Sequence, residues 1–382
     1  MKTKTYWSRR ALGALAALVL ALGLGTGLAA CSGGADAGSA AGSATTATAE
    51  VRTFTDSAGR EVEVPVQIDK IVPSGHTANM VLLTFAPEKM VGLSQEMTED
   101  QAVYLGDRVA DDLPILGAAF GAKGDLSKES VAATGAQILI DTGEYKDGIE
   151  QDLDDLQEQL GIPCVFIETN LDDWGSAYRA LGELLGLEDR GEEFATYCDN
   201  AYSEVMDIME TIPENERPSV LFCTGEAGTN VLAKGSYQAG VVDLLANNVA
   251  VVDSPSGSGN GNESNLEQIA AWDPDVILFG TVSGSDTFFD SVATDPTWST
   301  LRAVQNGDYY EIPSDPYNWL NNPPTINQIL GLQWLARLLY PEQFADTDSI
   351  EEVVKGYYGQ FYGYELSDAE FAELTAHALP NA

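Results

Sequence analysis

Histidine is too scarce in this chain for most hydrolytic chemistry. The sequence contains two histidines, His76 and His377, and its four cysteines show no C-x-x-C spacing. A catalytic metal centre needs clustered histidines and carboxylates, which two separated histidines cannot supply. The nucleophile motif G-x-S-x-G is also absent. We therefore expect a binding protein with no catalytic residue and no resident cofactor, and we keep a surface hydrolase as an alternative.

Candidate ligand-binding side chains lie in loops that follow apolar, strand-like segments. An imidazole can ligate a metal or hydrogen-bond a ligand, and a tyrosine can stack its ring or offer its phenol to Fe(III). We expect Trp319 to be exposed, because its surroundings, SDPYNWLNNPP, are polar. The candidates are His76, Phe120, Tyr145, Tyr237, Asn318 and Trp319, and His76 is also the candidate for direct metal ligation.

A duplicated pattern indicates the scaffold that positions these loops. ESVAATGAQILI begins at Glu129 and EQIAAWDPDVIL begins at Glu267, and Ser127 and Asn265 precede them as predicted helix N-caps. Apolar strands that alternate with helices predict an α/β protein with two Rossmann-like lobes and mostly parallel sheets. Since ligands of such sheets bind outside the carboxyl ends of the strands, we expect the ligand cleft between the lobes.

One long helix is predicted to join the lobes. Apolar residues recur at three- and four-residue steps from Phe194 to Ile212, and Pro213 closes the pattern. The predicted divisions are a signal peptide at 1–30, a lipidated cysteine and flexible linker at 31–50, an N-terminal α/β lobe at 51–187, the connecting helix at 188–213, a C-terminal α/β lobe at 214–345, and a C-terminal helical segment and tail at 346–382. We expect His377 to lie in a disordered tail.

The N-terminus resembles a bacterial lipoprotein signal. Basic residues precede an uncharged run over residues 11–30, and the sequence LAAC ends this run at Cys31. Residues 32–50 are built almost wholly from Gly, Ala, Ser and Thr, a composition typical of a flexible tether. We therefore expect lipidation at Cys31 and a protein anchored to the extracytoplasmic face of the bacterial cell membrane, with an uncleaved membrane anchor as the alternative.

The negative charge of the chain excludes nucleic acid and anionic membrane surfaces as partners. Residues 1–30 hold four of the 19 basic residues and none of the 59 acidic ones, so the remaining chain carries a formal charge of −44. Such a chain is repelled by nucleic acid and by anionic headgroups. We expect no nucleic-acid partner and no membrane contact except through the lipid.

Four segments of the chain resemble segments of the helical-backbone (class III) substrate-binding proteins of ABC importers for iron complexes and cobalamin, and they occur in the same order as in that family. They are TDSAGREVEVPVQIDKIV, EYKDGIEQDLDDLQEQLGIPCVFIE, LEQIAAWDPDVILFG and DPTWSTLRAVQNGDYYEIPSDPYNW, and the similarity runs from about Phe54 to Pro341. The resemblance implies a monomer that delivers its ligand to a permease powered by an ATPase. It also implies that Glu129 and Glu267 dock on permease arginines, one from each lobe.

The ligand class follows from what the loops lack. They contain no arginine, and Lys123, Lys146 and Lys234 are their only cations. Catecholate siderophores and haem propionates favour arginine forks, so the lack of arginine argues against a strongly anionic ligand. We expect an iron complex, which is either a ferric siderophore, preferably of the hydroxamate kind, or haem. The alternatives are a corrinoid such as cobalamin, a molybdate- or tungstate-type oxyanion, and a surface sensor or adhesive lipoprotein without a transporter. The NWLxxPP segment is similar to that of oxyanion-binding members, but Asn321 and Asn322 replace the charged residue expected there.

Overall fold

The structure is a computed structural model that describes residues 50–380, with the exception of residues 111, 121–123 and 281–287. Cys31, the predicted signal peptide and Lys123 lie outside the described residues. No helix in the described part of the chain is both long and apolar enough to cross a membrane.

A three-stranded parallel sheet, in the order β3-β4-β5, forms the centre of the first lobe. Its strands are buried almost throughout, which explains their near-continuous apolar sequences. The elements of this lobe are β1 (Val51–Thr55), β2 (Glu61–Pro65), β3 (Ile71–Pro73), α1 (His76–Phe85), α2 (Glu99–Leu105), α3 (Lys128–Thr134), β4 (Ile138–Gly143), α4 (Ile149–Leu160), β5 (Cys164–Glu168) and α5 (Trp174–Leu185).

The second lobe has a sheet in the order β11-β10-β6-β7-β9, with β8 also paired to β6. β6, β8, β10 and β11 pair in parallel, whereas β7 is antiparallel to both β6 and β9. The elements are β6 (Ser219–Thr224), β7 (Asn230–Val231), α7 (Gly240–Leu245), β8 (Asn247–Asn248), β9 (Asn262–Glu263), α8 (Leu266–Trp272), β10 (Val276–Phe279), α9 (Phe289–Val292), α10 (Arg302–Asn306) and β11 (Tyr309–Glu311). The predicted two-lobe α/β fold with mostly parallel sheets is confirmed.

The sequence repeat corresponds to one unit in each lobe. Ser127 caps α3 by accepting a hydrogen bond from the Ser130 amide, and Asn265 caps α8 by accepting one from the Gln268 amide. Each helix then leads into a central parallel strand, β4 in the first lobe and β10 in the second. Both predicted N-caps are confirmed.

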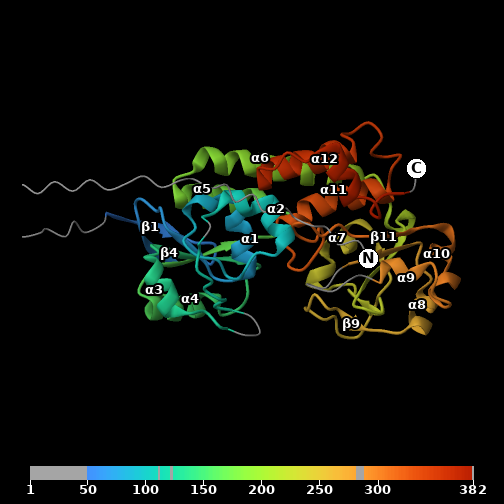
Figure 1. The fold of residues 1–382 in the computed structure, drawn as a ribbon, viewed down its shortest axis with the longest axis horizontal. Coiled ribbons are helices and arrows are strands. Elements are labelled where there is room, and N and C mark those ends of the chain that lie inside the picture. Colours follow the sequence, from blue (N-terminus) through green and yellow to red (C-terminus); the bar gives the residue numbers. More distant parts are fainter. Residues whose placement is uncertain (1–49, 111, 121–123, 281–287, 381–382) are drawn as a thin grey trace, which may run out of the picture. The chain divides into compact units, whose positions relative to one another are not determined.

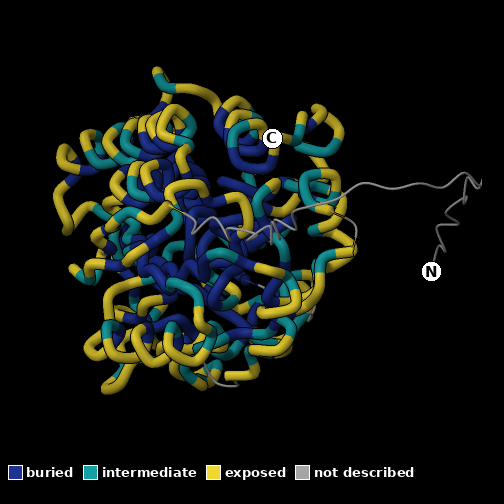
Figure 2. The backbone as a smooth tube through the Cα atoms, turned by 90° about the vertical axis from the view of Figure 1, so that its left-hand side faces the viewer, coloured by how far each residue is buried: buried dark blue, intermediate teal, exposed yellow. Residues whose placement is uncertain are grey.

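Helix α6 (Glu188–Met209) connects the lobes and buries one face, including Phe194, Cys198 and Val205. It ends four residues before the predicted end of the helix, since Pro213 disfavours a helical conformation in the residue before it. In Figure 1, α6 lies beside α11 (Asn327–Leu339), which also packs against α12 (Ile350–Tyr357). Figure 2 shows buried backbone running through the interior, with exposed backbone at the outer turns.

The chain beyond α12 returns to the first lobe and inserts aromatic rings into it. We call residues 357–364, which include the π-helical turn η6 (Tyr358–Tyr362), the C-terminal clasp. Phe361 is fully buried, and its ring centroid lies 5.0 Å from that of Phe194, 5.2 Å from Tyr197 and 6.1 Å from Tyr178. Arg108 donates hydrogen bonds to the carbonyl oxygens of Phe361 and Thr84, 2.5 and 3.2 Å away. The clasp is thus packed against both the first lobe and the connecting helix α6.

The prediction that His377 lies in a disordered tail is wrong. After α13 (Asp368–Leu374), the carbonyl of His377 accepts a hydrogen bond from the Glu311 amide at 2.9 Å. Its ring stacks on Phe289, with centroids 4.6 Å apart, and its Nδ1 lies 3.1 Å from Glu311 Oε2. Pairing to the edge of β11 therefore orders this segment.

Candidate ligand-binding site

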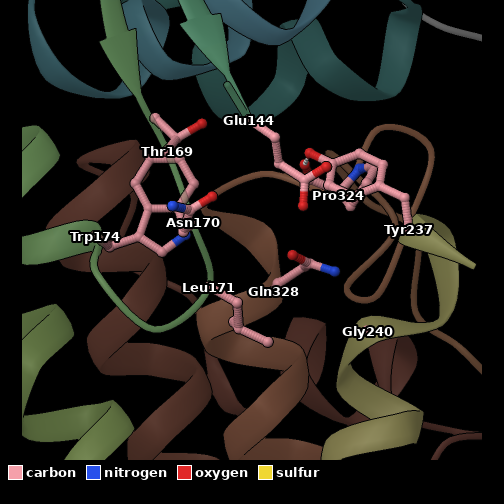
Figure 3. A pocket seen from close by; sticks show the side chains of 9 residues that line it. All are labelled: Glu144, Thr169, Asn170, Leu171, Trp174, Tyr237, Gly240, Pro324 and Gln328. Carbon is pink, nitrogen blue, oxygen red and sulfur yellow. Dashed lines mark hydrogen bonds between the residues drawn. The ribbon is translucent and has the colours of Figure 1, made fainter. Parts of the chain in front are cut away.

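A cavity of about 130 Å³ lies where loops of the two lobes meet. From the first lobe, its lining comes from the segments that follow β4 and β5 and from the start of α5; from the second, it comes from Tyr237, the start of α7 and the start of α11 (Figure 3). The lining residues are Glu144, Thr169, Asn170, Leu171, Trp174, Tyr237, Gly240, Pro324 and Gln328. This is the carboxyl-end edge of the first sheet, where ligands of α/β sheets bind.

Glu144 is the only charged side chain among the described residues that line the cavity. Burial raises the pKa of its carboxyl, Lys146 lowers this pKa and Glu168 raises it further. Tyr237 donates its hydroxyl hydrogen to the Pro324 carbonyl at 3.2 Å, and burial and the charge of Glu144 both raise the pKa of its phenol. The cavity therefore has a negative potential and no cation of its own.

Some buried polar atoms here have no hydrogen-bond partner within the described residues. They are Trp174 Nε1, Thr142 Oγ1 and both amide atoms of Asn321. Leaving a buried polar group unpaired costs about 1–3 kcal/mol, so such atoms indicate places where water or a ligand completes the hydrogen bonding. Trp174 is one of the residues that line the cavity.

A buried carboxyl lies deeper at the same strand edge. Asp141, near the end of β4, is 9% exposed and accepts a hydrogen bond from the Ser74 hydroxyl. Burial raises the pKa of Asp141 to about 6, although the hydrogen bond from Ser74 and the charge of Lys146 lower it. Strongly perturbed carboxyls gather at functional sites, which supports the assignment of this edge as the binding edge.

Of the predicted ligand-binding residues, Tyr237 lines the cavity and the others do not. His76 is the exposed first residue of α1, with Nδ1 3.1 Å from Ser94 Oγ. Tyr145 is exposed and donates its hydroxyl hydrogen to Glu150 at 2.8 Å. Phe120 is half-buried against the apolar core of the first lobe. Across the described residues no group of three or more histidine, cysteine or acidic side chains could hold a metal ion, so His76 belongs to no such group there.

Trp319 is buried, which corrects the expectation of an exposed indole. It is 1% exposed, and its ring packs edge-on against Trp334 of α11 at 5.9 Å between centroids. Asn318 shapes the turn around it, since its Oδ1 accepts hydrogen bonds from the amides of Leu320 and Asn321 at 3.0 and 3.1 Å. Asn318 thus satisfies backbone amides of this segment, and the indole joins the core.

The sequence of this chain matches a known protein family. The family model described as periplasmic binding protein matches residues 87–316, more than half of the chain. This chain belongs to the periplasmic binding protein family. The predicted relationship to the class III binding proteins of ABC importers is confirmed. The family consists of solute-binding proteins and is not a class of enzymes.

Three relatives show the range of this periplasmic binding protein's family. The chain is 24% identical to the molybdate-binding protein MolA of Haemophilus influenzae, over 81% of this chain and 91% of MolA. It is 23% identical to the Fe(3+)-citrate-binding protein YfmC of Bacillus subtilis, over 52% of this chain and 60% of YfmC. Among solved structures, an ABC transporter solute-binding protein from Sulfurospirillum deleyianum is similar, with a TM-score of 0.75, 26% identity and coverage of 85% of this chain and 99% of that one.

Every arginine of this binding protein's described body is engaged elsewhere in the fold. Their partners are backbone carbonyls or carboxylates, and none of these arginines lines the cavity. The pairs are Arg52 with Glu183, Arg60 with Asp56 and Asp154, Arg108 with Thr84 and Phe361, Arg179 with Glu192, Arg190 with Glu88, Arg217 with Leu244, Arg302 with Asp273 and Asp275, and Arg337 with Glu204. No arginine fork is therefore available to an anionic ligand.

The predicted docking residues lie on the exposed surface of this binding protein. Glu129 and Glu267 are both exposed and occupy the first turns of α3 and α8. A carboxylate in a first helical turn is favoured by the helix dipole by about 0.3–1 kcal/mol. Neither residue lines the cavity, so a role on the outer surface is compatible with their position.

Sequence reasoning placed a candidate loop at residues 142–146 but singled out Tyr145 there instead of Glu144, and it missed Asn170, Trp174 and Gln328. The loop that follows the apolar segment CVFIE carries a signal that could have found Asn170, because it too begins at the carboxyl end of a parallel strand. Gln328 carried no such signal, since it lies in the first turn of a helix that is otherwise core.

Proposed function

We propose that this periplasmic binding protein captures a ferric chelate of neutral or positive charge, of the hydroxamate kind, and delivers it to an ABC permease. The observation that carries this proposal is the charge of the site. Glu144 is the lone charged group of the cavity lining, and the arginines of the described body are committed to structural pairs. A carboxylate repels anionic chelates, and carboxylate and amide oxygens accept hydrogen bonds from neutral or cationic ones.

The size of the cavity supports a ligand that enters it only in part. The volume of about 130 Å³ is less than half of the roughly 300 Å³ or more that pockets for drug-sized ligands have. The body of a chelate therefore occupies the cleft outside the cavity, and one arm of the chelate reaches inside.

An oxyanion such as molybdate is the second candidate. It is supported by the relationship to MolA, which is a molybdate-binding protein, and by the small volume of the cavity. The charge of Glu144 and the lack of an arginine oppose it.

Calorimetric titration of the protein, cut after residue 50 and free of lipid, tests the proposal. The ligands are a ferric tris-hydroxamate, ferric citrate, haem, cobalamin and molybdate. We expect the ferric tris-hydroxamate to bind at least about tenfold more tightly than the others. Tighter binding of molybdate or ferric citrate overturns the proposed ligand class, and tighter binding of cobalamin or haem replaces it with that ligand.

We also propose that the protein is held at the extracytoplasmic face of the cell membrane by lipid on Cys31 and works as a monomer. The support is the signal-like sequence before Cys31 and the strongly acidic chain after it. Acyl chains supply about 0.8 kcal/mol per buried methylene, so two or more chains anchor the protein stably. Cys31→Ser is expected to release the protein into the medium. Immunoblots of carbonate-washed membranes and of medium measure this, and a variant that stays in the washed membranes contradicts the lipid anchor.

A further inference from the structure

The cavity presents several hydrogen-bond acceptors and, among the described residues of its lining, no cationic donor. Asn170 donates from its amide nitrogen to Glu168 at 3.1 Å, and Gln328 donates from its amide nitrogen to the Leu320 carbonyl at 3.1 Å. These bonds orient both amides and leave Asn170 Oδ1 and Gln328 Oε1 as acceptors, while each amide nitrogen keeps one further N–H. Tyr237 has likewise used its hydroxyl hydrogen on the Pro324 carbonyl and keeps only lone pairs.

Glu144 adds the only charge to this set of acceptors. Figure 3 shows its carboxylate descending between the Asn170 side and the Tyr237 side, above Gln328. Among the described residues Glu144 forms no ion pair, and Lys146 is not part of the lining. Three oxygen-bearing side chains, Glu144, Asn170 and Gln328, thus surround one small space from different directions.

Trp174 provides a second, independent observation. It is 3% exposed, it lines the cavity, and its Nε1 has no partner in the described part of the chain. Its Nε1 can donate to a neutral carbonyl of the same ligand. A buried donor of this kind indicates a ligand or water that the protein itself does not supply.

A primary ammonium matches this arrangement. It has three donors and no acceptor, which matches three convergent oxygen-bearing side chains of which one is a carboxylate. An oxyanion would face the same oxygens and the like charge of Glu144, and the described lining offers it no cationic donor. A guanidinium needs a planar, bidentate partner, which the single carboxylate could provide only on one edge.

We infer that this cavity binds the primary ammonium of an alkylamine arm, and that the preferred ligand is a hydroxamate-type ferric chelate that carries such an arm. The inference rests on the proposed function, because the chelate body occupies the cleft outside the cavity. A charge-assisted hydrogen bond in a partly buried site contributes about 1.5–3 kcal/mol, which corresponds to about 10- to 100-fold in affinity.

The test uses two chelates that differ in one charge. The first is a linear ferric tris-hydroxamate that ends in a primary amine, and the second is the same chelate with the amine acetylated. We expect the wild-type protein to bind the amine form about 10- to 100-fold more tightly. Glu144→Gln is expected to bind the amine form only as tightly as the acetylated form, with unchanged affinity for the acetylated form.

Asp147→Asn is the matched control. Asp147 is exposed, lies three residues from Glu144 in the same loop and does not line the cavity. Asp147→Asn therefore removes the same charge as Glu144→Gln but removes no contact with a ligand in the cavity. We expect it to keep the preference for the amine form, and thermal unfolding confirms that both variants are folded. Equal binding of both chelates by the wild type, or a preference that survives Glu144→Gln, overturns the ammonium site while the chelate function stands. If neither chelate binds, the proposed function fails as well.

Discussion

Cells that carry the double variant Glu129→Ala/Glu267→Ala are expected to take up almost none of the ligand, while the purified variant binds it with unchanged affinity. The two glutamates lie at equivalent positions of the sequence repeat, in the first turns of α3 and α8, and are exposed. We propose that each pairs with an arginine of the permease. Exposed charges at the edge of an interface act mainly on encounter and orientation, so the defect of each single variant should be largest at low salt and shrink at higher salt, where the wild-type pairs are screened as well.

Glu158→Ala/Glu342→Ala is the control for this prediction. Both residues are exposed and lie outside the repeat, so the control removes the same net charge. It is expected to support normal uptake. The caps at Ser127 and Asn265 are untouched in the test variant, and the loss of two first-turn carboxylates should lower stability by no more than about 2 kcal/mol in total. Normal uptake by the test variant leaves only the helix-dipole role, and lost ligand binding places these glutamates in the binding site instead.

Phe361→Ala is expected to lower the free energy of unfolding by about 3–5 kcal/mol, the range for large-to-small substitutions of buried phenylalanine. Phe361 is the centre of the C-terminal clasp, with Phe194 and Tyr197 edge-on to its ring and Tyr357 stacked on it at 4.5 Å. The substitution leaves a cavity between the first lobe and the clasp, because rings on several elements cannot all collapse into it.

Denaturant unfolding followed by circular dichroism measures this effect, with Phe371→Ala as the matched control. Phe371 lies in α13, ten residues further along, and is only half-buried. Its loss should cost clearly less than that of Phe361. Equal, small losses for the two variants contradict a structural role for the clasp.

Local signals predicted much of the fold. Ser127 and Asn265 were identifiable as caps because a short polar side chain before an apolar helical pattern is a local feature. The apolar runs that became β4, β5, β6 and β10 were identifiable because strands buried on both faces have nearly continuous apolar sequences. Both signals lie within about a dozen residues of the element that they predict.

The site was predicted less well, for reasons of distance along the chain. Tyr237 was found, whereas Trp319 was expected to be exposed and is buried against Trp334. The local sequence around Trp319 is polar and therefore predicts exposure. The burial of Trp319 depends instead on α11, which packs over this segment, and no local pattern of the sequence predicts that packing. Gln328 lines the cavity, and its amide donates a hydrogen bond to the Leu320 carbonyl. The hydrophobic periodicity of a helix does not predict such a contact. The clasp was missed because Arg108 and Phe361 are separated by 253 positions.

The clasp also makes the order of synthesis matter. A chain that is translated or exported from its N-terminus presents α5 and α6 long before residues 357–364 emerge. Until then the rings of Tyr178, Phe194 and Tyr197 lack their partner Phe361 and remain accessible to chaperones and proteases. A product truncated before the clasp would therefore carry an exposed aromatic patch on its first lobe. Such a patch gives quality-control proteases outside the cytoplasm a physical basis for separating incomplete chains from finished ones.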